Sequence, residues 1–309
     1  MAEVVSTAPP KWLDRATYPF APKCLDANGA RMSYLDEGSG DPIVFVHGSP
    51  SWSFIWRGLV RDLSRDYRCL APDMIGFGLS SKPTTYSHTP EAHCRALNTF
   101  IDSLGLKNVT LVLHGFGGPL GMAYAQAHTD NVKRMVLMNT WFWDLHGDVA
   151  VERSLGALDG FLGGFLCQKT NAIAKVALHA FGDPKRKSEA FERALCGPLS
   201  TPEGRAGALA VLRQTLSAGS YYQEIWKDRE ALIDVPKLML WGAKDPLFGA
   251  AMLNHAMSAY PQDDVERMDD VGHFPMEEKP VECARAIRNF FAAPVRARVG
   301  LVSSQVNLF

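Results

Sequence analysis

Short apolar runs alternate with amphipathic segments along most of the chain. The segment 89–105 has the signature of a helix, because Thr89 can cap it, Pro90 suits its first position and Gly105 can end it. Strand-like runs rich in Val, Leu and Ile occur at 41–48, 67–73, 108–114, 132–139 and 235–242. Helical spacing follows most of these runs, including 248–259 and 279–292 near the end. This alternation predicts an α/β fold with a parallel sheet covered by helices on both faces.

Residues from about 142 to 230 break the alternation. They are helix-like, with Gly and Pro punctuation and no convincing strand, in stretches such as LGALDGFLGGFL, FGDPKRKSEAFERAL and TPEGRAGALAVLRQTL. We expect an all-helical cap over the carboxyl end of the sheet. The predicted organisation is therefore a core formed by residues 1–141 and 231–309 and a cap formed by 142–230. The sequence does not decide how the tail VRARVGLVSSQVNLF packs.

Composition narrows the possible partners. The formal net charge of the 309 residues is -1, which gives no electrostatic reason to expect nucleic acid or an anionic membrane. No apolar run reaches the ~18 residues of a membrane span, and the start of the chain does not resemble a secretory signal. The six dispersed cysteines are typical of reduced thiols. We expect a soluble cytoplasmic protein, while the oligomeric state stays open.

Two glycine-containing turns follow predicted strands. In LVLHGFGGPLG (111–121) the strand enters a sharp turn and continues as a helix, and Gly115 stands at the centre of the turn. In many hydrolases this position carries the attacking residue. The backbone N–H of Phe116 and that of Ser49, in the HGSP turn (47–50), are candidate donors of an oxyanion hole.

The order and wording of the motifs resemble one family over about residues 25–292. The segments are FVHGSPSWSFIWR, RCLAPDMIGFGLSSKP, VLHGFGGPLGMAYA, VLMNTWFW, WGAKDPLF and VGHFPMEEKP. They resemble the α/β-hydrolase fold, and in detail the haloalkane dehalogenases with the related epoxide hydrolases and β-lactone decarboxylases. The resemblance implies a mostly parallel, eight-stranded sheet flanked by helices, with the helical cap inserted.

The resemblance also implies that part of the family's catalytic machinery has been replaced. In that family the turn reads His-Asp-Trp-Gly-Gly, where Asp is the nucleophile and the Trp N–H helps to hold the halide. Here Gly115 stands in place of the Asp, and Phe116, which cannot donate a side-chain hydrogen bond, in place of the Trp. Ser49 occupies a position where part of the family has a further halide donor. Covalent dehalogenation by the family's route is therefore not expected.

Two other positions match the family's remaining catalytic residues. Asp245 in WGAKDPLF corresponds to the catalytic acid and His273 in VGHFPMEEKP to the catalytic His. An Asp that accepts from one imidazole nitrogen leaves the other nitrogen free as a base. His47 and His114 are expected to support loops, and Asp73 to brace a turn. Five aromatic side chains are expected to line the substrate pocket, namely Trp52, Trp141, Phe142, Trp143 and Phe274.

Two classes of function remain open. The first is an enzyme that acts on a small, largely apolar organic substrate by His-Asp general-base chemistry without a covalent nucleophile, as a hydrolase or a lyase. The second is an inactive or ligand-binding protein that keeps the pocket, or an inactivated variant of a haloalkane dehalogenase or β-lactone decarboxylase. No cluster of residues has the spacing of a zinc site, so we expect neither a metal nor a cofactor.

Overall fold

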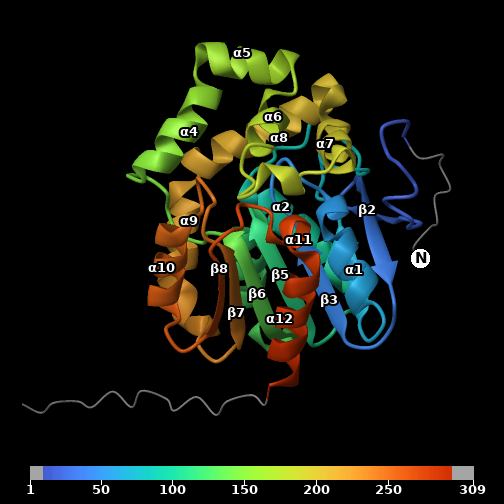
Figure 1. The fold of residues 1–309 in the computed structure, drawn as a ribbon, viewed down its shortest axis with the longest axis vertical. Helices are drawn as coiled ribbons and strands as arrows, with labels where there is room; N and C mark the ends of the chain where they lie inside the picture. The colour runs from blue at the N-terminus through green and yellow to red at the C-terminus, as the bar shows by residue number, and fades with distance from the viewer. Residues whose placement is uncertain (1–9, 294–309) are drawn as a thin grey trace, which may run out of the picture.

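The computed structural model of the chain describes residues 10–293 and contains one eight-stranded sheet (Figure 1). The sheet order is β1-β2-β4-β3-β5-β6-β7-β8; β2 runs antiparallel to β1 and β4, and the other neighbours are parallel. This confirms the expected mostly parallel α/β-hydrolase sheet. The strands are β1 Lys23–Ala27, β2 Ala30–Glu37, β3 Pro42–Val46, β4 Arg68–Pro72, β5 Val109–Gly115, β6 Val132–Thr140, β7 Lys237–Gly242 and β8 Asp264–Met268.

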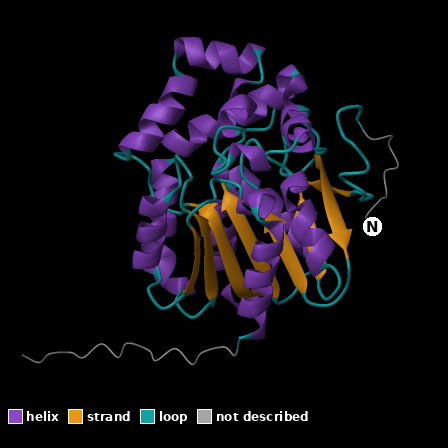
Figure 2. Cartoon of the chain, in the orientation of Figure 1, coloured by secondary structure: helices purple, strands orange, loops and turns teal. Residues whose placement is uncertain are grey.

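Helices lie in front of the sheet and behind it (Figure 2). They include α1 Arg57–Leu63, α2 Pro90–Ser103, α3 Gly117–Ala127, α10 Ala250–Ala259, α11 Pro275–Glu278 and α12 Pro280–Ala292. Helix α2 begins and ends close to the predicted bounds, and the Thr89 side chain accepts a hydrogen bond from the N–H of Ala92, as its cap position predicts. α1 and α12 pack on each other in front of the strands (Figure 1).

The connection between β6 and β7 contains helices and no strand. Its α-helices are α4 Val149–Asp159, α5 Phe161–Lys169, α6 Ala172–Ala177, α7 Glu189–Cys196, α8 Pro202–Ser217 and α9 Gly219–Lys227. Helices α4 to α8 lie beyond the carboxyl ends of the strands (Figure 1). In contrast, α9 packs on α3, where Gln126 Nε2 donates to the Ile225 carbonyl over 2.8 Å. The expected cap of 142–230 thus includes a helix that lies against the core. The ends of the expected core, 1–9 and 294–309, lie outside the described residues.

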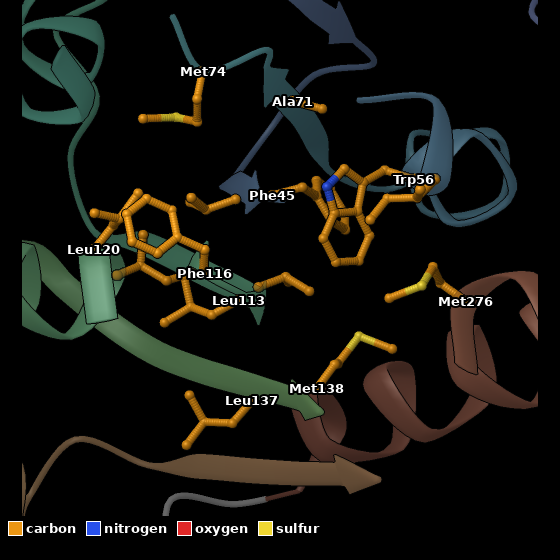
Figure 3. Close-up of a cluster of buried hydrophobic side chains, with 14 of the residues drawn as sticks. Phe45, Trp56, Ala71, Met74, Leu113, Phe116, Leu120, Leu137, Met138 and Met276 are labelled. Carbon is orange, nitrogen blue, oxygen red and sulfur yellow. The ribbon is translucent and has the colours of Figure 1, made fainter. Parts of the chain in front are cut away.

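The strands and the surrounding helices share a continuous apolar core. Figure 3 shows side chains from the middle of the sheet packed between segments that are distant in the sequence. Phe116, directly after β5, lies beside Leu113 and Leu120 in this cluster (Figure 3). The apolar core therefore packs against the turn between β5 and α3 and holds it in place. The labelled members of the cluster are Phe45, Trp56, Ala71, Met74, Leu113, Phe116, Leu120, Leu137, Met138 and Met276.

Candidate active site

The turn between β5 and α3 places Gly115 at the carboxyl edge of the sheet. Gly115 has φ +53°, a left-handed conformation that glycine adopts without the steric cost of a Cβ. The Thr140 hydroxyl donates to the Gly115 carbonyl over 2.6 Å and so ties the turn to the end of β6. A Cβ on Gly118, one turn further on, would collide with this same Thr140 side chain. Close packing against Thr140 therefore requires a glycine at position 118.

Asp245 and His273 meet although they follow different strands. Asp245 comes after β7 and His273 after β8, and Asp245 Oδ2 lies 2.6 Å from His273 Nδ1. The Asp245 carboxylate is buried, and its Oδ1 accepts from the Leu247 N–H over 2.9 Å. Burial alone raises the pKa of Asp245, but the facing His273 and the N–H groups of Leu247 and Phe248 bring this pKa below its ordinary value. The carboxylate therefore stays ionised and can orient the imidazole.

The backbone of His273 is fixed on both sides. Its N–H donates to the Ala180 carbonyl over 2.7 Å, and its carbonyl lies 2.8 Å from His114 Nε2. Burial lowers the pKa of His114 well below the usual range, so His114 is neutral and donates through Nε2. His47 has a similar place in the neighbouring turn, where its ring contacts the Gly48 carbonyl and accepts from the Met74 N–H over 2.9 Å. Both histidines make loop-supporting contacts.

Asp73 holds a buried turn beside the site. Its carboxylate accepts the backbone N–H of Ser53 and that of Leu79, each over 2.8 Å. Burial raises the pKa of Asp73 to about 6. These contacts are the bracing contacts that the sequence suggested.

Two side chains that support the Asp245–His273 pair were not identified from the sequence. Asn139, at the end of β6, donates to Asp245 Oδ2 over 3.0 Å and accepts the Gly242 N–H over 2.8 Å. The buried Glu278 carboxylate accepts the N–H groups of Gly182, in the cap connection, and Gly272, next to His273, over 3.1 and 2.7 Å. In the sequence, Glu278 could have been noticed as the second acidic residue of MEEKP, and Asn139 as a polar residue at the end of a predicted strand.

An apolar cavity of about 370 Å³ opens above Gly115. An ideal Cβ built on Gly115 would stand 3.9 Å from His273 Nε2, which places this nitrogen over the turn. Within residues 10–293, His273 Nε2 has no hydrogen-bond partner. The lining residues come from both the core and the cap: Ser49, Pro50, Gly115, Phe116, Trp141, Ser154, Leu155, Leu158, Ile173, Val176, Ala177, His179, Ala180, Leu212, Thr215, Asp245, Pro246, Leu247, Phe248 and His273.

The two turns predicted to supply oxyanion donors touch one another. Ser49 and Phe116 both line the cavity. A Cβ built on Gly48 would lie only 2.9 Å from the Phe116 backbone nitrogen and 3.0 Å from the Gly115 Cα. The HGSP turn and the turn at Gly115 therefore form one continuous rim of the cavity.

The structure corrects the predicted aromatic lining. Trp141 lines the cavity, where its ring stacks on Phe248 with centroids 4.9 Å apart and planes 10° apart. The other four predicted rings do not line this cavity; they are Trp52, Phe142, Trp143 and Phe274. Instead, Leu155 and Leu158 of α4, Phe248 and residues of α6 supply its apolar walls.

The four excluded rings each pack elsewhere in the core. Trp52 Nε1 donates to the Ala194 carbonyl over 2.7 Å, beneath the cap. Phe142 and Trp143 pack against Trp226 at centroid distances of 5.8 Å, near α9 and α10. Phe274 packs against Phe191 at 5.1 Å. Aromatic residues next to a catalytic motif are as suitable for the core as for a pocket, so their sequence position did not separate the two roles.

No group of three or more His, Cys, Asp or Glu side chains in residues 10–293 could hold a metal ion. In the same part of the chain, no helix is long and apolar enough to cross a bilayer.

Sequence comparison agrees with this geometry. A family model described as the alpha/beta hydrolase fold matches residues 41–280. The chain is 30% identical to haloalkane dehalogenase 2 of Mycobacterium tuberculosis over 276 residues, covering 89% of this chain and 96% of that one. It is 33% identical to a cis-3-alkyl-4-alkyloxetan-2-one decarboxylase of Xanthomonas campestris over 290 residues, covering 88% and 96%.

Solved structures show the same relationship. The crystal structure of the haloalkane dehalogenase DatA from Agrobacterium tumefaciens superimposes with a TM-score of 0.77 at 27% sequence identity, covering 87% of this chain and 95% of that one. The chain therefore belongs to the α/β-hydrolase family, in which it is similar to haloalkane dehalogenases and oxetanone decarboxylases.

Proposed function

We propose that this protein is an enzyme that acts on a small, largely apolar substrate through His273 and Asp245, without a covalent nucleophile. The observation that carries the proposal is the position of His273 Nε2. This nitrogen lies over Gly115 in the wall of an apolar cavity, while Nδ1 is held by an ionised, buried carboxylate. A His-Asp pair in this arrangement is suited to general-base catalysis.

The space above Gly115 determines the kind of base catalysis. In relatives of this chain, by the resemblance, a carboxylate projects from this position and attacks the substrate carbon. Without that carboxylate, His273 Nε2 can accept a proton from a water molecule whose oxygen bonds to an electrophilic substrate carbon. The bond from that carbon to the leaving oxygen then breaks, and the proton passes from Nε2 to the leaving group.

The developing negative charge needs donors at the same edge. The backbone N–H groups of Ser49 and Phe116 are our candidates, because both residues line the cavity and their turns are in contact. Two such donors are worth roughly 3–4 kcal/mol each in transition-state stabilisation. For a lyase reaction the same arrangement applies, with His273 removing the proton from the substrate itself.

The apolar lining determines the substrate class. A cavity of about 370 Å³ walled by Leu, Ile, Val, Phe and Trp side chains suits a compact organic molecule with one electrophilic or acidic carbon. The names of the relatives indicate haloalkanes and alkyl-substituted oxetanones as chemical starting points. Because Gly115 and Phe116 lack the groups that the dehalogenase route uses, we favour esters, lactones and epoxides over haloalkanes.

The alternative function is ligand binding without turnover. It is favoured by Gly115 itself, since a glycine at positive φ relieves backbone strain that a catalytic side chain would impose. The two functions separate with His273→Gln, compared with His255→Gln on the surface of α10. The enzyme loses turnover of every substrate with the first variant and keeps it with the second. A binding protein shows ligand-dependent thermal stabilisation but no turnover in any of the three proteins.

A further inference from the structure

Helix α5 carries a row of exposed apolar side chains that the proposed catalytic site does not use. Phe161, Leu162, Phe165 and Leu166, hereafter the α5 patch, are 99, 68, 55 and 43% exposed. Residues four apart share a helix face, so Phe161 lies beside Phe165 and Leu162 beside Leu166. Figure 1 shows α5 across the end of the molecule furthest from the sheet. A contiguous apolar patch of this kind marks an interaction surface.

The opposite side of α5 packs against the cap, so only one face of the helix is exposed. Gly164 and Cys167 are buried against the rest of the cap. The Arg205 guanidinium, on α8, donates to the Gln168 carbonyl over 2.7 Å and anchors the end of α5. The helix therefore presents its large apolar side chains outward while it stays fixed on the cap.

The charged residues of the segment that contains α5 are basic, and Asp159, the acid directly before this segment, is paired with Arg213 of α8. From Gly160 to Gly182 the chain contains Lys169 and Lys175 and neither Asp nor Glu. Both lysines are exposed. The net charge of the whole chain is -1, which gave no reason to expect an anionic surface as a partner, but this local segment is basic. Exposed Phe and Leu next to Lys are the composition of helices that lie in a lipid–water interface.

We propose that the α5 patch docks on the surface of an anionic lipid bilayer, with Phe161, Leu162, Phe165 and Leu166 inserted among the lipids and Lys169 and Lys175 at the head groups. This is attachment to one leaflet by a short helix, not a membrane span.

The size of the patch distinguishes this proposal from a dimer. The four side chains together expose on the order of 500 Å², whereas a stable protein interface buries ~800 Å² on each partner. Helix α5 also lies across the end of the molecule (Figure 1), where it can reach a flat lipid surface.

The two helices that flank α5 in the sequence line the catalytic cavity. Helices α4 and α6, which flank α5 in the sequence, supply Leu155, Leu158 and Val176 to the cavity wall. Val176 is also 48% exposed, so an apolar wall of the cavity reaches the surface there. If the proposed function holds, a largely apolar substrate dissolved in the bilayer could enter at this point. The docking itself does not depend on catalysis.

The test measures co-sedimentation of the full chain with vesicles of phosphatidylcholine containing phosphatidylglycerol, and with vesicles of phosphatidylcholine alone. The unmodified protein is expected to bind the anionic vesicles more strongly, and less at high salt. The double variant Phe161→Asp/Phe165→Asp should bind at least tenfold more weakly to both. Lys169→Glu and Lys175→Glu should each lose about fivefold or more on the anionic vesicles only. All the changed side chains are exposed, so each variant should fold, and circular dichroism checks this.

Val281→Asp is the matched control, since Val281 is 75% exposed but lies on α12. It should bind vesicles as the unmodified protein does. The proposal is overturned if the unmodified protein sediments with neither vesicle, or if the double variant binds as well as the control. It is also overturned if the unmodified protein does not bind vesicles and sedimentation velocity shows that it forms a dimer, whereas the double variant is a monomer. The α5 patch then contacts a second copy of the chain. Since no substrate is present, these results are independent of the proposed catalytic function.

Discussion

The Asn139 amide donates a hydrogen bond to Asp245 Oδ2, the same carboxylate oxygen that faces His273. The Asn139 side chain also contacts the backbone of Gly242 through both its donor and its acceptor. Asn139 has φ +36°, an uncommon conformation for a residue with a side chain. The end of β6 is thus arranged so that one buried amide connects β7 to Asp245.

Removal of this amide should destabilise the protein. Asn139→Ala leaves the Gly242 N–H without a partner in a buried site and removes one of the two hydrogen-bond partners of Asp245 Oδ2, at a cost of about 2–4 kcal/mol in the free energy of unfolding. Urea unfolding measures the loss. Asn254→Ala, on the exposed surface of α10, is the control and should change stability by no more than ~0.5 kcal/mol. Equal stability of the two variants would show that the hydrogen bonds of the Asn139 side chain do not contribute to stability.

Glu278 should position the loop that carries His273. Glu278→Gln keeps the shape but turns one acceptor oxygen into an NH2 group. In place of Oε1 this group faces the N–H donors of Gly182 and Gly272, and in place of Oε2 those of Gly182 and Asp183. We expect a loss of ~1–3 kcal/mol in unfolding free energy and a lower kcat with little change in KM. Glu266→Gln, on the exposed face of β8, is the control for removal of a carboxylate charge. A kcat equal to that of the control would contradict this positioning role.

His88 gives the protein a defined pH dependence. Burial lowers the pKa of His88 to about 4, and its Nδ1 has no hydrogen-bond partner in the described part of the chain. Between the unfolded pKa of ~6.5 and about 4, only the unfolded state binds the proton. The free energy of unfolding attributable to His88 therefore falls as the pH drops through this window.

His88→Phe should reduce that acid-side loss. His47, whose pKa burial lowers to about 4, adds to the same loss, whereas Asp73, whose pKa is raised to about 6, opposes it. Chemical denaturation at pH 5 and at pH 8 measures the effect. The free energy of unfolding of the variant minus that of the unmodified protein should be larger at pH 5 than at pH 8. At pH 8 His88 is neutral in both the folded and the unfolded state. The same difference at both pH values would refute the assignment.

The space above Gly115 can be tested with a methyl group. Gly115→Ala places a Cβ 3.3 Å from the Gly48 Cα at φ +53°, whereas Gly105→Ala places one at φ +59° with no atom within 4 Å. Both variants should lose ~1–2 kcal/mol from the left-handed backbone alone. Thermal or urea unfolding should show a further, smaller loss for Gly115→Ala, because the neighbouring turn must shift slightly. A much larger loss would mean that the site has no room for a side chain.

Much of the fold could be predicted from the sequence because β3 to β7 are buried, continuous apolar runs. The outer strands β1, β2 and β8 were not identified from the pattern. β8 is mostly exposed, so apolar periodicity is absent there, and the expected total of eight strands came from the family resemblance.

The candidate site was predicted only in part. Gly115, Asp245 and His273 stand in motifs, so their proximity followed from the order of the strands. The partners Asn139 and Glu278 act through hydrogen bonds across long sequence separations, which no local pattern encodes. The aromatic pocket was wrong for four of its five rings for a related reason. Whether a ring faces a cavity or the core depends on packing from the cap, and the sequence alone does not specify that packing.

The most direct test of the account compares the unmodified protein with Gly115→Asp and His273→Gln on a panel of haloalkanes, epoxides, esters and lactones, by halide, acid and product release. We predict that the unmodified protein turns over a member of the panel, that His273→Gln lowers this rate by ~10²–10⁴-fold, and that Gly115→Asp abolishes or redirects it. An inert unmodified protein together with an active Gly115→Asp variant would contradict the account, because the cavity would then be a site that lacks only its nucleophile.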